Sequence, residues 1–337
     1  MKKSLLALAA LTAFAGAASA QSSVTLFGIV DLSVNSVKNG SASQKLVSSD
    51  ALNSNRLGFR GVEDLGGGMR AGFWIEGAMA PDTGGTGQTW QRRSTVSLMG
   101  GFGEIRLGRD YTPSFFNKTV FDPFGTNGLG SEVNLESTLG SGATTLVRAN
   151  NTVGYFLPAM GGVYGQVQVA AGEGATGNKY MGGRIGYAGG PVNVAVAMGK
   201  TSKTGAMVDD FTDFNVGASF NLGFMTLIGQ FGKVDYSTSN QKKLLLAATV
   251  PFGASTLKAS FLKASGSSAS LEAKQFAFGY QYDLSKRTAL YATLSKVDNS
   301  SAAGFNVGQG ANRNATTGLL PAGQDSTGYN AGVRHSF

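Results

Sequence analysis

The segment QFAFGYQYDLSKR, residues 275–287, combines the two patterns that decide the fold of this chain. Its first eight residues alternate between large aromatic side chains and small or polar ones, which is the period of two expected of a half-buried β-strand. The aromatic set is Phe276, Phe278, Tyr280 and Tyr282. The polar segment DLSKR that follows has the composition of a tight turn. The segment therefore predicts a strand that ends at a short turn.

The same two patterns recur along the chain. VYGQVQVA at residues 163–170 and PVNVAVAM at residues 191–198 each alternate in the way of a half-buried strand. Short turn signals of similar composition lie near residues 67, 101, 161, 189, 222, 253 and 285. These seven turns join fourteen strands at one end, and the first and last strands have free ends there, so we predict about sixteen strands.

The connections at the opposite end are longer and more polar. They comprise NGSASQKLVSSD (39–50), PDTGGTGQT (81–89), GKTSKTGAMVDD (199–210) and the tract 299–326. Short turns at one end and long loops at the other are typical of an outer-membrane barrel. We therefore predict an all-β fold, a transmembrane antiparallel β-barrel.

The first residues, MKKSLLALAALTAFAGAASAQ, have the features of a secretory signal peptide. Two lysines precede an apolar run, and an A-x-A site at residues 18–20 predicts cleavage before Gln21. We exclude residues 1–20 from the fold and treat residues 21–337 as a single barrel domain. No other segment approaches the roughly 18 consecutive apolar residues of a transmembrane helix, which excludes a helical membrane protein. An exported chain without cysteine cannot be held together by disulfides.

One long-end connection is much longer than the others. Residues 113–147, PSFFNKTVFDPFGTNGLGSEVNLESTLGSGATTLV, are too many for a hairpin loop. We expect this third long loop to fold into the lumen of the barrel and to set the size limit of the pore.

The final segment, YNAGVRHSF at residues 329–337, alternates up to its last residue. One face carries Tyr329, Ala331, Val333, His335 and Phe337. Because chain ends usually fray, an aromatic residue in register at the end predicts a strand that closes the barrel. We identify Phe337 as a C-terminal assembly signal.

The residues needed for catalysis, metal binding or nucleic-acid binding do not occur in suitable patterns. His335 is the only histidine, no cysteine is present, and neither a G-x-S-x-G elbow nor a phosphate-binding G-x-x-x-x-G-K-[ST] loop appears. The pI near 9.6 reflects basic residues that are scattered rather than clustered, which argues against nucleic acid. We expect no enzyme, no cofactor and no metal.

Several motifs in this order resemble those of Gram-negative general porins over essentially the whole mature chain. They are NRLGFRGVEDLGGGMRAGFWIEG, GEIRLGRDY, RANNTVGYFLP, LSKRTALYATLSK and the terminal phenylalanine. The resemblance implies a homotrimer of sixteen-stranded barrels in the outer membrane, through which ions and small hydrophilic solutes diffuse passively. It also implies contact with outer-membrane lipid or lipopolysaccharide and with the barrel-assembly machinery.

The resemblance further implies a pore constriction in which arginines of the wall face acidic groups. Matched motif by motif, the basic wall would consist of Arg56, Arg92 and Arg148. Opposite them the acidic side would consist of Glu76, Asp122 and Glu132. The chain has DPFG where enterobacterial members have Pro-Glu-Phe-Gly, which puts the acidic positions of the loop in doubt. Three arginines against fewer or more distant carboxylates predict a preference for anions.

Arg92 and Arg93 in WQRRSTVSL are adjacent, so on a strand their side chains point to opposite faces, and each charge needs water or a partner. We expect Arg92 in the water-filled lumen, because on the lipid face at mid-bilayer it would cost roughly 2 to 4 kcal/mol. Arg93 would then face outward, near the interface or against a neighbouring subunit. A bulge between them would exchange these roles. Arg56 and Arg148 have the alternative of reaching lipid headgroups from the ends of strands.

Two other functions remain open. One is a substrate-specific porin that binds a chosen anion at the arginines, and saturable block of conductance by that anion would identify it. The other is a barrel that acts mainly as an adhesin or surface antigen through its long loops, which would form no stable channel in planar bilayers.

Overall fold

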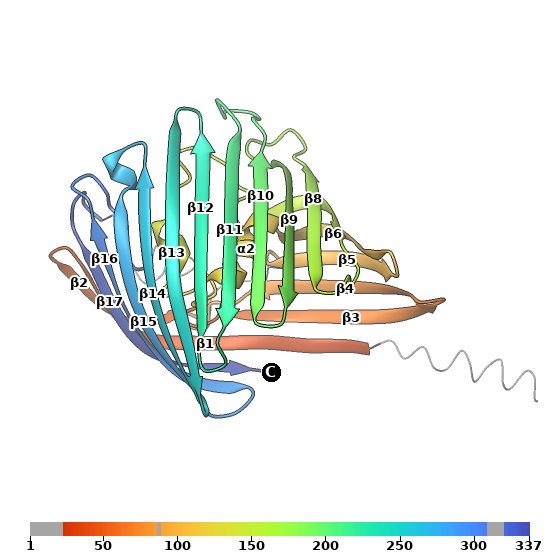
Figure 1. Ribbon diagram of the computed structural model, residues 1–337, viewed down its shortest axis with the longest axis horizontal. Helices are drawn as coiled ribbons and strands as arrows, with labels where there is room; N and C mark the ends of the chain where they lie inside the picture. The colour runs from red at the N-terminus through yellow and green to blue at the C-terminus, as the bar shows by residue number, and fades with distance from the viewer. Residues whose placement is uncertain (1–22, 86–88, 309–319) are drawn as a thin grey trace, which may run out of the picture.

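A computed structural model describes residues 23–85, 89–308 and 320–337. The predicted signal peptide, residues 1–20, lies outside the described residues. The chain forms one antiparallel sheet that closes into a barrel (Figure 1). Its strands are β1 Ser23–Asn39, β2 Ala42–Ser49, β3 Arg56–Gly66, β4 Met69–Ala78, β5 Arg93–Gly100, β6 Gly103–Tyr111, β7 Arg148–Phe156, β8 Val163–Ala171, β9 Lys179–Gly189, β10 Val192–Thr201, β11 Phe211–Asn221, β12 Thr226–Tyr236, β13 Ser239–Phe252, β14 Ser255–Gly266, β15 Ala273–Asp283, β16 Thr288–Asn299 and β17 Ser326–Ser336.

β2 and β3 together make one strand of the barrel, because both pair with β1. β3 pairs with the first part of β1, from Ser23 to Ile29, and β2 pairs with the second part, from Leu32 to Asn39. The seventeen segments therefore form sixteen strands of the barrel, as predicted. All seven short turns lie where the sequence indicated them. The expectation of a loop over residues 39–50 is wrong, because the long strand β1 offers an edge with which residues 42–49 pair as β2.

The barrel closes by pairing its first and last strands. β1 and β17 pair from Ile29 opposite Ser336 to Asn39 opposite Ser326. Beyond this ladder, the Phe337 N–H donates to the Gly28 carbonyl at 3.1 Å, and the Gly28 N–H donates back at 3.0 Å. A Cβ at Gly28 would lie 2.3 Å from the ring of Phe337. Position 28 therefore has to be glycine for the aromatic ring to lie against the backbone of β1.

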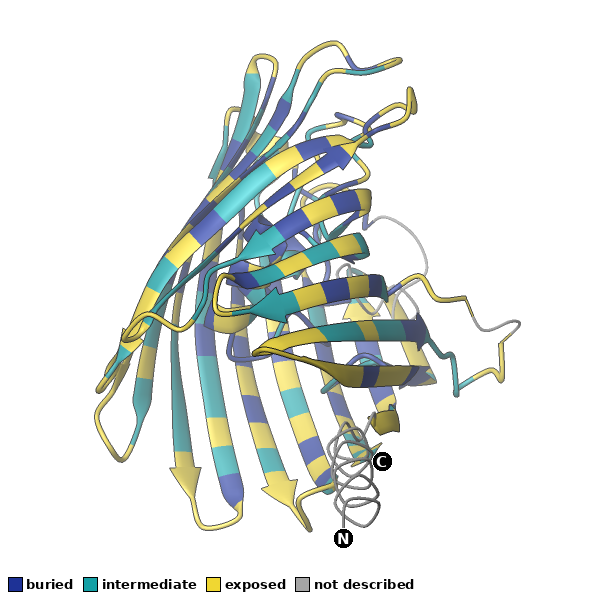
Figure 2. Ribbon diagram, turned by 90° about the vertical axis from the view of Figure 1, so that its right-hand side faces the viewer, coloured by how far each residue is buried: buried dark blue, intermediate teal, exposed yellow. Residues whose placement is uncertain are grey.

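The two faces of the wall differ as the alternation predicted (Figure 2). On β11, Asp213 and Asn215 are buried toward the lumen, whereas Phe214 between them is exposed on the outer face. On β15, Phe278 is 62% exposed and its neighbour Ala277 is buried. The outer face thus presents an apolar band to the membrane, and polar side chains line the inside. Within the described ranges, no helix has the length and apolarity that spanning a membrane requires.

The connection between β6 and β7 folds into the barrel, as predicted. It contains the helix α2, Pro113–Phe121, and the short 3₁₀ helix η1, Glu132–Leu135. The hydroxyl of Thr112 accepts from the N–H of Phe115 at 3.4 Å and begins α2, with proline in the first turn. α2 packs against β9, β10 and β11 from the inside (Figure 1). Phe121 at its end is fully buried, and its ring occupies the space left free by Gly217 on β11.

Candidate pore constriction

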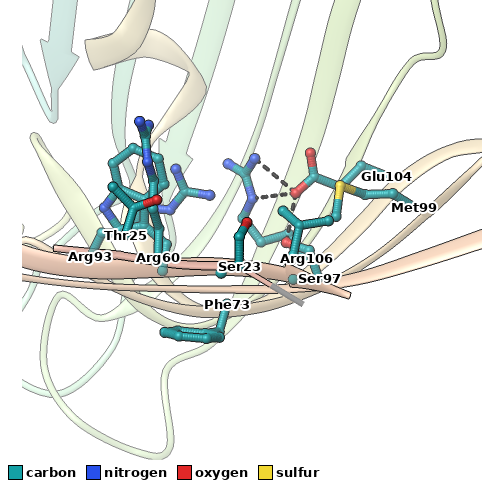
Figure 3. Close-up of a pocket in the computed structure, with 13 residues that line it drawn as sticks. Ser23, Thr25, Arg60, Phe73, Arg93, Ser97, Met99, Glu104 and Arg106 are labelled. Atoms are coloured by element: carbon teal, nitrogen blue, oxygen red, sulfur yellow. Dashed lines mark hydrogen bonds and ion pairs between the residues drawn. The ribbon is translucent and has the colours of Figure 1, made fainter. Parts of the chain in front are cut away.

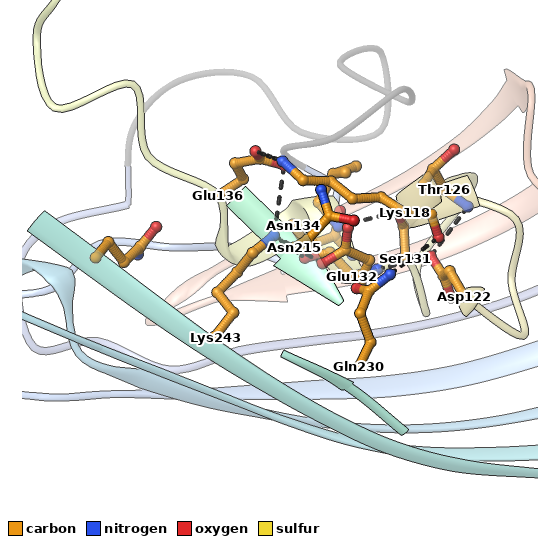
Figure 4. Close-up of polar contacts among 12 residues, drawn as sticks. Lys118, Asp122, Thr126, Ser131, Glu132, Asn134, Glu136, Asn215, Gln230 and Lys243 are labelled. Carbon is orange, nitrogen blue, oxygen red and sulfur yellow. Dashed lines mark hydrogen bonds and ion pairs between the residues drawn. The ribbon is translucent and has the colours of Figure 1, made fainter. Parts of the chain in front are cut away.

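Buried ion pairs hold the connection between β6 and β7, residues 112–147, against the wall (Figure 4). The Lys118 ammonium on α2 pairs with Asp213 of β11 at 2.8 Å and with Glu136. Lys243 of β13 pairs with Glu132 at 2.7 Å and with Glu136 at 3.4 Å. We call these five residues the loop latch. Each of their side chains is less than 10% exposed, so the pairs form with little competition from water.

The charges of the loop latch stabilise one another. Burial alone would lower the pKa of Lys118, but the carboxylates of Asp213 and Glu136 outweigh burial and raise it above its usual value. Burial alone would raise the pKa of Glu136, but Lys118 and Lys243 lower it to about 2. Both groups therefore stay charged at neutral pH, and the latch remains paired.

The three arginines predicted from the motifs converge on one part of the wall. Arg56 begins β3, Arg92 precedes β5, and Arg148 begins β7. Arg148 Nε donates to the Arg92 carbonyl at 2.7 Å, and its guanidinium lies 4.2 Å from the ring centre of Tyr111. Arg92 Nη2 donates to the hydroxyl of the same tyrosine at 3.3 Å. We call Arg56, Arg92 and Arg148 the upper arginine group.

Glu76 lies on the same wall as the upper arginine group and not opposite it, so its predicted side is wrong. Its Oε1 lies 2.6 Å from Arg92 Nε and 3.4 Å from Arg56 Nη1, and its Oε2 accepts from Trp74 Nε1 at 3.0 Å. The reason is the register: the short turn after β3 places Glu76 of β4 beside Gly58 and Arg93. Among the described residues, no carboxylate pairs with Arg148.

Asp122 and Glu132 lie in the inward-folded connection, but their contacts are not with the arginines. Asp122 accepts from the backbone N–H groups of Phe124, Thr126 and Glu132 at 2.9, 2.9 and 3.0 Å. Burial, together with the nearby Glu132 carboxylate, raises the pKa of Asp122 to about 6. Glu132 itself is paired with Lys243. The hydrogen bonds of both carboxylates shape and hold the loop.

Arg93 faces inward, so the expectation that it faces outward is wrong. Its Nε donates to Thr95 Oγ1 at 3.1 Å and lies 3.7 Å from Asp110, and its guanidinium is 4.6 Å from the ring centre of Trp74. Both arginines reach the inside because Arg92 lies just outside the strand. Regular alternation begins only at Arg93, the first residue of β5.

Arg93 belongs to a second set of arginines that sequence reasoning missed. Arg60, Arg93 and Arg106 line a cavity of about 390 Å³ nearer the short-turn end and project into the same space, while Phe73 points to the other side of the wall (Figure 3). We call these three residues the lower arginine group. Arg106 pairs with Glu104 at 2.9 Å and with Asp110 at 2.6 Å.

The lower arginine group also contains an arginine held without a carboxylate. Arg60 lies over the rings of Trp74 and Phe27, 5.1 and 5.4 Å from their centres, and has no ion pair in the part of the chain that is described. The signal was present in RLGFR, because residues four apart in a strand share a face and Arg60 must follow Arg56 to the lumen.

Comparison with known proteins gives consistent matches over the chain. The family model described as Gram-negative porin matches residues 7–302. Outer membrane porin protein 32 of Delftia acidovorans is 36% identical over 356 residues, with all of both chains covered. An outer membrane porin protein of Bordetella pertussis is 28% identical over 374 residues, covering 89% of this chain and 95% of its own.

Solved structures also match the chain over nearly its whole length. The anion-selective porin from Comamonas acidovorans superposes with a TM-score of 0.88 at 33% identity, covering 94% of this chain and 100% of its own. OmpT of Vibrio cholerae, as outer-membrane expressed protein, superposes with a TM-score of 0.67 at 13% identity, covering 95% of this chain and 99% of its own, which shows the fold alone.

Proposed function

Since the chain belongs to the Gram-negative porin family, we propose that it forms a water-filled outer-membrane channel in which the lumenal arginines favour anions. The family membership supports an outer-membrane porin as the general role. The anion preference rests on the charges of the wall, and passive diffusion of small hydrophilic solutes follows from a polar lumen.

The observation that carries the proposal is the excess of guanidinium over carboxylate in the upper arginine group. Glu76 pairs with both Arg56 and Arg92, and Arg148 is positioned by a carbonyl and an aromatic ring instead of an acid. Three guanidinium groups therefore share one ion-paired carboxylate, Glu76. Lumenal arginines act as anion filters, and low-dielectric walls focus their field where the pore is narrow.

Two further findings support the proposal. The lower arginine group continues the positive charge along the same wall, with Arg60 again held by aromatic rings. The solved structure that superposes with a TM-score of 0.88 is described as an anion-selective porin.

The test is the zero-current potential in a KCl gradient across a planar bilayer. We expect an anion-selective wild type and a smaller preference in Arg56→Ser, Arg92→Ser and Arg148→Ser, with the largest loss in the triple variant. Arg287→Ser, in the exposed short turn before β16, is the charge-matched control and should behave as the wild type. A cation-selective wild type, or a triple variant that keeps the full anion preference, would refute the proposal.

The lower arginine group favours a second candidate function, a channel specific for a chosen anion. Its cavity combines three guanidinium groups with Trp74, a surface that suits a carboxylate or phosphate with an apolar part. Such a solute would reduce the KCl conductance to a plateau as the solute concentration rises. In a general channel the conductance would instead change linearly with the solute concentration.

A further inference from the structure

The strand formed by β2 and β3 is interrupted by residues 50–55. Its ladder with β1 runs as far as Ser49 and resumes at Arg56. Across this interval β1 contributes only residues 30 and 31. The extra residues of the longer side cannot all join the ladder, so the chain has to leave the plane of the sheet there. We call residues 50–55 the protrusion.

The protrusion contacts the connection between β6 and β7 inside the barrel. Ser54 Oγ donates to Asn127 Oδ1 at 2.6 Å. A Cβ at Gly128 would lie 2.1 Å from the Ala51 carbonyl oxygen, so the two backbones are in close contact. Arg56 follows the protrusion directly, and its Nε donates to the Ser54 carbonyl at 2.9 Å. The protrusion therefore lies in the lumen and supports one member of the upper arginine group.

The carboxylate of Asp31 on β1 holds the protrusion. Its Oδ2 accepts from the backbone N–H groups of Leu52 and Asn53 at 2.7 and 2.5 Å. The side-chain amide of Asn55 donates to the Asp31 carbonyl at 2.9 Å and accepts from the Asp31 N–H. This amide thus takes the place of a strand neighbour, because it satisfies both backbone groups of Asp31 where the ladder is interrupted. Asp31 itself is fully buried.

Tyr291 connects the same carboxylate to the closing strands of the barrel. It lies on β16, and its hydroxyl donates to Asp31 Oδ1 on β1, with β17 between the two strands. Gly332 of β17 pairs with Tyr291 on one side. A Cβ at Gly332 would lie 2.4 Å from the Tyr291 hydroxyl, so glycine leaves the room that the ring needs. Asp31 therefore connects β16 with the protrusion.

The negative charge of Asp31 needs a reason in a channel that favours anions. Burying a carboxylate costs free energy that hydrogen bonds to it must offset. By its charge alone, an acidic side chain in the wall of a pore favours cations. Hydrogen bonds to a carboxylate are roughly twice as strong as those to a neutral acceptor, however, so Asp31 can fix the protrusion more firmly than a neutral residue.

We propose that Asp31 is a positioning residue of the channel. It fixes the protrusion in the lumen, and through the protrusion it fixes Arg56 beside Glu76 and Asn127 of the inward-folded connection. Its contribution to selectivity thus comes from the position of Arg56 and opposes the effect of its own charge. The part that concerns selectivity rests on the proposed anion preference, whereas the part that concerns the width of the lumen does not.

The test compares three variants in planar bilayers. Asp31→Ala removes the charge and the acceptors. Asp31→Asn removes the charge but keeps a side-chain oxygen that can accept from the N–H groups of the protrusion. Asn55→Ala removes the amide without changing any charge, and it carries the test if Asp31→Ala does not fold. Heat-modifiable migration on SDS gels shows in each case that the barrel has formed.

The charge-matched control is Asp283→Ala. It removes a partly exposed carboxylate on β15 that lies 3.9 Å from Arg334. The anion preference and the solute size cutoff of this control should not fall below and not rise above the wild type, respectively.

Loss of the acceptors should release the protrusion. A hydrogen bond to a charged group shifts an equilibrium roughly tenfold, so loss of two should favour the released protrusion by about a hundredfold. Asp31→Ala and Asn55→Ala should therefore lower the anion preference and raise the solute size cutoff, and Asp31→Asn should keep both close to the wild type. If Asp31 acted only by its charge, Asp31→Ala would strengthen the anion preference, and that result would overturn the proposal.

A double-mutant cycle tests whether Asp31 acts through Arg56. In Arg56→Ser the arginine that depends on the protrusion is absent, so adding Asp31→Ala should change the anion preference less than it does in the wild type. Equal changes in both backgrounds would overturn the role of Asp31 in positioning Arg56.

The size cutoff separates this inference from the proposed function. If Arg56→Ser alone keeps the preference of the wild type, the contribution of Arg56 to anion selectivity fails, and the cutoff still reports the position of the protrusion. A larger cutoff in Asp31→Ala and Asn55→Ala would then support the positioning role. An unchanged cutoff in both variants would overturn it.

Discussion

Removing the amine of Lys118 tests whether the loop latch suppresses open-channel noise by holding the loop against the wall. In Lys118→Met, the carboxylates of Asp213 and Glu136 remain buried against the wall with one cation fewer. Removing one partner of a buried ion pair costs about 3 to 5 kcal/mol. The contacts of Phe121 and the pair of Lys243 with Glu132 remain, so the barrel should still fold.

Most of this cost should appear as a shift between a seated and a displaced loop. A loss of about 3 kcal/mol raises the ratio of displaced to seated loop by about a hundredfold. Single-channel recordings in planar bilayers should therefore show excess open-channel noise and brief steps to higher conductance.

The design has a control and a rescue. Lys200→Met removes the partner of an exposed pair with Asp210, worth at most about 1 kcal/mol, and should leave the current unchanged. In Lys118→Met/Asp213→Asn the second buried charge is also removed, so the noise should fall back toward the wild type. A Lys118→Met channel as quiet as the wild type would show that the latch does not hold the loop.

Four further predictions concern the loop, the closure of the barrel and the assembly of the trimer. Burial raises the pKa of Asp122 to about 6 in the seated loop, above that of an exposed aspartate, so the seated loop binds this proton more tightly than a displaced loop; channel noise should therefore fall as pH drops from 7 to 5, and in Asp122→Asn it should be the same at pH 5 and 7. Deleting residues 127–141 should raise the conductance and the solute size cutoff, and unchanged values of both would place the constriction elsewhere. Deleting Phe337 should lower the level of protein in the outer membrane, as measured by quantitative immunoblotting, and Gly28→Leu should do the same because a side chain at position 28 meets the ring; normal levels of both would remove the role of this contact in assembly. Unheated protein should migrate on SDS gels as a trimer that heating splits, and monomer in mild detergent would contradict the homotrimer.

The parts of the fold that depend on local sequence could be predicted. Alternation along β15 and the turn after it follow from residues 275–287 alone, because the period of a strand and the composition of a tight turn are local properties. β2 could not be predicted in this way. Its polar segment becomes a strand only because β1 is 17 residues long and offers an edge with which it pairs.

The motifs indicated the positions of Arg56, Arg92 and Arg148, but not the lower arginine group and not the contacts of the acids. Arg56, Arg92 and Arg148 come together because each begins or precedes a strand of the same part of the wall. Glu76 and Arg93 lie opposite each other on β4 and β5, and this register follows from the short turn after β3 and the length of the strand that follows. The contacts of Asp122 depend on the conformation of a long loop, for which no periodic rule exists.

The closing ladder between β1 and β17 has a consequence for how the chain reaches its structure. The two strands lie at opposite ends of the barrel sequence, so their hydrogen bonds have the greatest sequence separation of any in the sheet. Pairing of this kind forms slowly, since a long loop of chain must be ordered before the contact forms. Until then β1 and β17 are both open edges that can pair with another chain. A change that delays this one ladder should therefore act on the rate of folding and on aggregation before it changes conduction by the finished barrel.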